Sequence, residues 1–159
     1  MSRRAYFKAE PGAPAPLRTT VRRVVRFEEV DSMAIVWHGR YPSFFEDARV
    51  ALGDSHGIGY LDFHAQGVLT PIKQMHVDYQ KPLRFKEEFS IEALLHWSEA
   101  ARINYEFILR NAAGQVTTTG YSVQLMLDTN YNLLMAPPPF YQEFRERWKA
   151  GELFTREPK

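Results

Sequence analysis

Hydrophobic and polar residues alternate along five segments of the chain, and this pattern predicts β-strands at 17–27, 72–79, 88–97, 102–110 and 116–127. Side chains that alternate in this way give a strand one apolar and one polar face, which is typical of an antiparallel sheet with one wet face. In the first segment we expect Val21, Val25 and Phe27 to lie on the apolar face.

Between the first two segments the apolar period changes from two residues to about four. From about His38 to Gly53, the residues Phe44, Ala48 and Leu52 recur at four-residue steps, with Phe45 beside them, which predicts an amphipathic helix. Pro42 is compatible only with the first turn, so the helix should begin just before it. Weaker patterns predict a short helical turn at 59–66 and a terminal helix at 143–149, with Phe140, Phe144 and Trp148 on one side.

The order of these elements predicts an α+β hotdog fold. A sheet with one apolar face must cover that face, and one long central helix is the only large element available to do so. We therefore expect an antiparallel sheet of five or six strands wrapped round this helix, in a domain covering residues 18–150. Residues 1–17 are rich in proline and predict a flexible N-terminal arm, and residues 151–159 form a C-terminal tail.

Composition restricts the classes of function. The 159 residues fit one domain, and 20 basic against 19 acidic side chains give a net charge of +1, which makes no broad electrostatic case for nucleic acid. The absence of cysteine excludes disulfides, thiolate metal sites and cysteine nucleophiles. With no secretory leader and no apolar run of membrane-spanning length, a cytoplasmic location is expected.

The strongest motif is the segment that joins the first strand to the helix. Residues 25–41 read VRFEEVDSMAIVWHGRY, the helix contains FFEDAR at 44–49, and VDYQKPLRF follows at 77–85. Together these stretches resemble the hotdog thioesterases of the 4-hydroxybenzoyl-CoA thioesterase and YbgC type, over about residues 20–140. One departure is Ala34, where the family often has glycine, a residue that readily adopts positive φ. This departure bears on the turn shape and on the acyl group accepted.

Thioester hydrolysis needs a group that activates water or attacks the carbonyl, and a group that stabilises the developing oxyanion. A carboxylate can do the first, and backbone N–H groups at a helix N-terminus can do the second. Asp31 lies in the loop just before the predicted helix, although aspartate in such a place is also a common turn or capping residue. The resemblance assigns the catalytic carboxylate to Asp31, as general base or nucleophile.

The resemblance also implies roles for neighbours of Asp31. His38 matches a histidine of YbgC-type members, which implies hydrogen bonding or acid–base chemistry, and the alternative is a partly exposed histidine in the first helical turn. Tyr41 is a family position that either joins the catalytic group or packs the helix against the sheet. Glu46 is the rival carboxylate, since another hotdog thioesterase branch uses a helix glutamate, but its spacing from Arg49 favours an ion pair on one helix face.

Substrate contacts are expected from two places in the motif. The resemblance places Val36 and Trp37 at the substrate. The segment 79–82 forms a Tyr–x–x–Pro-like element that resembles the family's. Lys81 within it and Arg84 and Lys86 after it either meet the phosphates or the phosphopantetheine arm of the substrate, or form a solvated basic turn. No histidine pair has zinc-like spacing with other ligands, so no metal and no cofactor is expected.

The sequence thus predicts a thioesterase acting on acyl-CoA or an acyl-carrier protein. Two alternatives stay open: a hotdog dehydratase on carrier-bound acyl chains, which usually needs a His–carboxylate pair across the cleft, and a non-catalytic acyl-CoA-binding module. A single hotdog sheet leaves a strand edge exposed, and such edges invite pairing. We therefore expect a homodimer or homotetramer with the active site between subunits.

Overall fold

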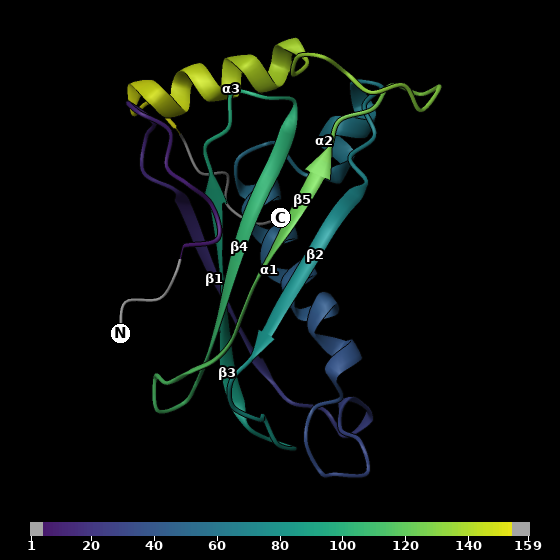
Figure 1. The fold of residues 1–159 in the computed structure, drawn as a ribbon, viewed down its shortest axis with the longest axis vertical. Coiled ribbons are helices and arrows are strands. Elements are labelled where there is room, and N and C mark those ends of the chain that lie inside the picture. Colours follow the sequence, from purple (N-terminus) through teal and green to yellow (C-terminus); the bar gives the residue numbers. More distant parts are fainter. Residues whose placement is uncertain (1–4, 154–159) are drawn as a thin grey trace.

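A curved antiparallel sheet surrounds one long helix in the computed structural model, which describes residues 5–153 (Figure 1). The strand order is β1-β3-β4-β5-β2. The helix is α1 (Tyr41–Ser55), and the strands are β1 (Leu17–Val24), β2 (Ile72–Tyr79), β3 (Glu88–His96), β4 (Arg102–Asn111) and β5 (Val116–Leu125). The α+β hotdog architecture predicted from the sequence is confirmed.

The apolar stripe of α1 forms the centre of the core. Phe44, Phe45, Ala48 and Leu52 are all fully buried, as the four-residue spacing predicts. The ring of Phe45 stacks on Phe107 of β4 with 4.4 Å between centroids. Pro42 lies in the first turn, where its missing N–H costs no hydrogen bond. The helix therefore begins where the proline predicts and covers the inner face of the sheet.

Two shorter helices, α2 (Tyr60–Ala65) and α3 (Pro139–Ala150), complete the fold. α3 lies across one end of the sheet (Figure 1). It begins at Pro139 instead of the predicted Glu143, because proline is well suited to the first helical position. Trp148 is buried and donates a hydrogen bond to the Ala15 carbonyl over 3.1 Å. Among residues 5–153, no helix has both the length and the apolar character needed to cross a bilayer.

Two predicted strand ends are wrong. β1 ends at Val24, and the chain then forms the 3₁₀ helix η1 (Phe27–Glu29), so Phe27 is 77% exposed and lies edge-on to Phe85 instead of facing the core. β5 ends at Leu125, and beyond this residue Leu127 forms only isolated bridges, to Leu69 and Leu133. The end of β1 comes with the hydrogen bond from the Arg26 N–H to the Glu29 carboxylate, which alternation does not report.

The described part of the N-terminal arm lies on the outer face of the sheet. Residues 5–16 form no helix or strand, and the Tyr6 hydroxyl donates to Asp78 of β2 and is 2.7 Å from Thr119 Oγ1 of β5. The predicted arm at 1–17 and tail at 151–159 extend outside the described residues, at 1–4 and 154–159. The flexibility of both segments stays a prediction.

Candidate active site

Asp31 opens a tight turn between η1 and α1. Its N–H donates to the Ile35 carbonyl over 2.9 Å, and the Ala34 N–H donates back to the Asp31 carbonyl over 2.9 Å. Its Oδ1 accepts the Met33 N–H over 2.8 Å. Asp31 therefore does have the turn role that aspartate favours. Its Oδ2 has no hydrogen-bond partner within the part of the chain that the structure describes, and this oxygen remains available for chemistry.

Ala34 occupies the left-handed position of this turn, with a φ of 62°. The turn therefore has the backbone shape that the family's glycine would allow, and alanine adopts it against the repulsion between Cβ and the following carbonyl. The substitution noted in the sequence thus leaves the turn geometry in place and adds a methyl group beside it.

Replacing Ala34 by glycine is expected to raise the free energy of unfolding by about 0.5–1 kcal/mol, because relief of the left-handed strain exceeds the added entropy of the unfolded chain. Urea denaturation measures the change. Ala113 lies in an exposed turn at negative φ, so Ala113→Gly should lower stability and serves as the control. Equal losses in the two variants would contradict the strain argument.

A groove of about 330 Å³ lies beside the Asp31 turn. Its walls come from the turn, from the start of α1 and from the end of β2. The lining residues are Asp31, Met33, Ile35, Val36, His38, Tyr41, Tyr79, Gln80, Lys81 and Pro82. The structure thus brings together the three predicted catalytic residues and two of the predicted substrate contacts.

Three other predicted substrate contacts do not line this groove. Trp37 is half exposed, and its ring lies against Gly39, where an added Cβ would be 2.3 Å from Trp37 Cζ3. Arg84 is exposed. Lys86 has a φ of 65°, and its ammonium lies 5.5 Å from the centroid of the Phe85 ring. Any contact of these side chains with a substrate would therefore involve a part outside the groove.

His38 begins the short 3₁₀ helix η2 (His38–Arg40), which runs directly into α1. Its carbonyl accepts the Tyr79 hydroxyl over 2.8 Å, which ties this point of the chain to β2. Its N–H has no acceptor among residues 5–153. An unsatisfied N–H at the start of a helix carries partial positive charge, and it is the type of donor that stabilises an oxyanion.

Tyr41 forms the floor of the groove. It is buried, and its ring lies edge-on to Tyr79 with 5.0 Å between centroids. Burial raises the pKa of the Tyr41 hydroxyl, and burial also raises the pKa of Tyr79. Both hydroxyls therefore keep their protons at neutral pH, so they can donate hydrogen bonds but do not act as bases.

Comparison with known proteins agrees with the chemistry that this geometry allows. The family model of the thioesterase-like superfamily matches residues 25–147, which include the Asp31 turn, the groove and the whole sheet except β1. The chain belongs to the thioesterase-like superfamily. Membership makes this protein a thioester hydrolase.

Individual proteins are similar to this thioesterase over most of its length. The chain is 30% identical over 104 residues to YneP of Bacillus subtilis, whose name assigns it as an acyl-CoA thioesterase, covering 65% of this chain and 75% of YneP. The DHNA-CoA thioesterase of Staphylococcus aureus superposes with a TM-score of 0.74 at 23% identity, covering 84% and 91% of the two chains. The S. aureus hypothetical protein SAV2348, solved with CoA, gives 0.75 at 15% identity, covering 92% and 93%. The structural matches establish the fold.

The predicted pairing of Glu46 with Arg49 is wrong. Arg49 is buried, and its guanidinium donates to the Tyr60 hydroxyl over 3.1 Å and to Ser122 over 3.4 Å. Glu46 is exposed on α1, and no hydrogen bond or ion pair joins these two described residues. The rival carboxylate of the thioesterase thus lies away from the groove that Asp31 lines.

A His–carboxylate pair does exist in this thioesterase, but it lies on the wrong face for the groove. His76 Nε2 is 2.9 Å from Asp78 Oδ2. Val77 between them packs against the core, so both side chains point to the outer face of the sheet. This pair does not supply the cross-cleft arrangement that a dehydratase needs. Across residues 5–153, no three His, Asp or Glu side chains gather closely enough to hold a metal ion.

Sequence reasoning missed the groove residues contributed by the end of β2. Tyr79, Gln80 and Pro82 line it together with Lys81. The signal was the Tyr–x–x–Pro-like element itself, which the resemblance identified as a family feature without assigning it to the site. The antiparallel pairing of β2 with β5 at the edge of the sheet brings this element to the start of α1.

Proposed function

We propose that this thioesterase hydrolyses acyl thioesters of CoA or of an acyl-carrier protein, with Asp31 as general base or nucleophile. The observation that carries the proposal is that one groove contains both an available Asp31 oxygen and the residue whose N–H has no acceptor, His38. These are the two chemical functions that thioester hydrolysis requires.

The reaction follows from these two groups. The thioester carbonyl oxygen accepts a hydrogen bond from the His38 N–H, which stabilises the negative charge that develops on this oxygen. The Asp31 carboxylate either removes a proton from the attacking water or attacks the carbonyl carbon itself. The carbon–sulfur bond then breaks and the thiol leaves with a proton. With Asp31 as the base, the oxygen of the attacking water stays on the acyl group, which is released as a carboxylic acid. With Asp31 as the nucleophile, the acyl group remains on Asp31 as an anhydride, and a water molecule hydrolyses this anhydride to release the acid and restore the carboxylate. The His38 imidazole, exposed at the groove, is the candidate donor of that proton.

The groove suggests how the substrate lies. Met33, Ile35 and Val36 provide apolar contacts for the acyl group, with Trp37 beside them. Lys81 lies at the groove, and Arg84 and Lys86 are the further cations that we assign to the phosphates of CoA. Placement in the 4-hydroxybenzoyl-CoA thioesterase and YbgC type is part of this proposal, supported by the Asp31–His38 motif. We place the reaction in the cytoplasm, a reducing compartment that fits a chain without cysteine.

A panel of aryl, short-chain and long-chain acyl-CoAs, with matching acyl-carrier proteins, tests this function. We expect release of free thiol, followed with a thiol-reactive dye, and free carboxylic acid by mass spectrometry. A dehydrated acyl product without free thiol would select the dehydratase alternative. Tight binding of acyl-CoA with no turnover across the panel would select the non-catalytic binding module.

We also propose that two copies pair through the β2 edge to complete the site, in a homodimer or a homotetramer. β2 is an edge strand, and it exposes Ile72 and Tyr79, which are 39% and 52% exposed. Open edges favour pairing, and two-fold symmetry is its commonest form. Light scattering is expected to give at least twice the chain mass of 18.5 kDa. A strictly monomeric mass at assay concentration would rule out a shared site.

A further inference from the structure

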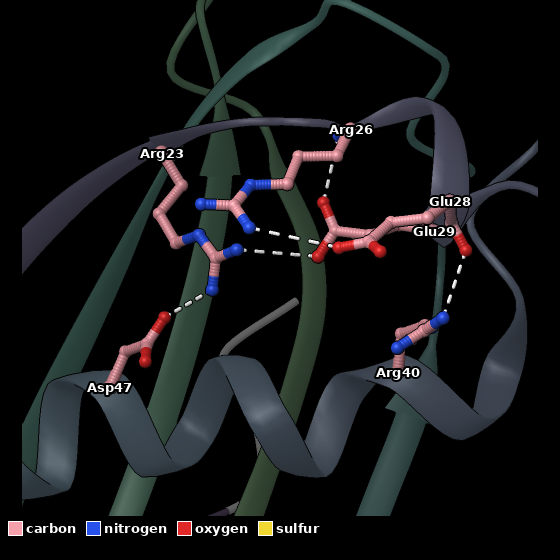
Figure 2. A network of polar contacts seen from close by, with 6 residues as sticks. All are labelled: Arg23, Arg26, Glu28, Glu29, Arg40 and Asp47. Carbon is pink, nitrogen blue, oxygen red and sulfur yellow. Dashed lines mark hydrogen bonds and ion pairs between the residues drawn. The ribbon is translucent and has the colours of Figure 1, made fainter.

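A group of charged side chains that the catalytic proposal does not use joins the segment just before the Asp31 turn to β1 and to α1 (Figure 2). They come from the end of β1, from η1, from the residue before α1 and from the first half of α1. We call this group the arginine–carboxylate network, and its members are Arg23, Arg26, Glu28, Glu29, Arg40 and Asp47.

Glu29 is the most buried member of the network, with 4% of its surface exposed. Its carboxylate accepts the Arg26 N–H over 2.8 Å and lies 3.3 Å from Arg23 Nη2. Its carbonyl accepts the Trp37 N–H over 2.9 Å. Glu29 therefore holds the chain on both sides of the Asp31 turn. Before the turn it binds Arg26, and after the turn it binds Trp37, the residue directly before His38.

The network also fixes η1, the segment just before the Asp31 turn, relative to α1. The second terminal nitrogen of Arg23, Nη1, pairs with Asp47 of α1, so this one guanidinium links the buried Glu29 carboxylate to the helix. Arg40, directly before α1, donates to the Glu28 carbonyl over 2.9 Å. Figure 2 shows the Glu28–Glu29 segment held in this way from β1 and from the helix.

We propose that Glu29 is a positioning residue for hydrolysis, acting through the placement of Asp31 relative to the His38 N–H. This inference rests on the proposed function of Asp31. A base or nucleophile and an oxyanion donor must both meet one carbonyl group, and small displacements between them lower the rate strongly. A buried carboxylate held by a guanidinium and a backbone N–H permits little displacement, because losing either contact leaves a buried charge without compensation.

Glu29→Gln tests the proposal with little change in shape. The amide oxygen still accepts the Arg26 N–H, but the charge that holds Arg23 is lost. We expect kcat to fall by about tenfold while KM stays within about twofold, since the acyl contacts of the groove are unchanged and only the reacting geometry loosens. The measurement is steady-state kinetics on the best thioester of the panel, with urea denaturation of the same samples.

Glu28→Gln is the matched control. Its side chain is 64% exposed and lies 3.6 Å from Arg26, so the same change of charge at the adjacent position should leave kcat and KM unchanged. If Glu29→Gln does not fold, Asp47→Asn releases Arg23 at its half-exposed end, and a fall in kcat alone is again expected. A folded Glu29→Gln, or in its place Asp47→Asn, with wild-type kcat would overturn the proposal.

A double variant separates this role from general destabilisation. If Glu29 acts through Asp31, adding Glu29→Gln to Asp31→Asn should cause no further loss, because residues that act as one unit are not additive. A further tenfold loss in that background would overturn the positioning role. An Asp31→Asn variant with full activity would instead remove the proposed function, and the positioning role with it.

Discussion

Replacing Asp31 by asparagine is expected to lower kcat for thioester hydrolysis by about 10³-fold, which corresponds to about 4 kcal/mol in the activation barrier. The asparagine side-chain oxygen can still accept the Met33 N–H, so the turn should persist. The amide has no negative charge, so it can neither deprotonate water nor attack the carbonyl. Thiol release from the preferred substrate, with KM and urea stability measured in parallel, gives the result.

The chain provides a close control for this variant in the turn at Asp128. There the Asn130 N–H donates to Asp128 Oδ1 over 2.8 Å, and the Asp128 N–H donates to the Asn132 carbonyl over 2.9 Å. Tyr131 has a φ of 63°, as Ala34 has a φ of 62° in the Asp31 turn. This geometry repeats that of the Asp31 turn outside the groove. Asp128→Asn should therefore leave kcat unchanged. Comparable activity of the two variants would mean that Asp31 serves only the turn.

Replacing Gly120 by alanine is expected to lower the free energy of unfolding by about 3 kcal/mol or more, at the upper end of the cost of overpacking a core. Gly120 of β5 lies opposite the ring of Phe45, and an added Cβ would be 2.6 Å from that ring and 2.4 Å from the His76 carbonyl oxygen. The ring is itself held by its stacking on Phe107, and the carbonyl belongs to the paired strand, so neither can move freely.

Urea denaturation of Gly120→Ala is best compared with Gly114→Ala. Gly114 has a φ of 76° and no neighbouring atom within 4 Å, so alanine there costs only backbone strain, about 1 kcal/mol. A loss at Gly120 no larger than at Gly114 would show that the sheet and α1 separate easily, and that this contact does not set the distance between them.

Local periodicity accounts for how much of the fold the sequence predicts. The alternation in β2–β5 and the spacing of Phe44, Ala48 and Leu52 depend on neighbours within one element, and Pro42 marks a helix start by its own covalent geometry. The same reasoning located Asp31 in the loop before the helix. The prediction placed Phe27 in the first strand, but a hydrogen bond from the Arg26 N–H to the Glu29 carboxylate ends the extended chain before it. The alternation of apolar and polar residues does not indicate such a bond.

The sequence alone determined the architecture and the segment that carries the candidate chemistry. Both follow from patterns between residues close together in the chain: the apolar periodicity of each element and the motif at 25–41. Only the tertiary structure decided what stands beside Asp31. It brought Tyr79 and Gln80 to the groove through the pairing of β2 with β5, and it turned Arg49 away from Glu46 toward Tyr60. These neighbours come from distant parts of the chain, and their meeting depends on how the sheet closes round α1, which no local pattern encodes.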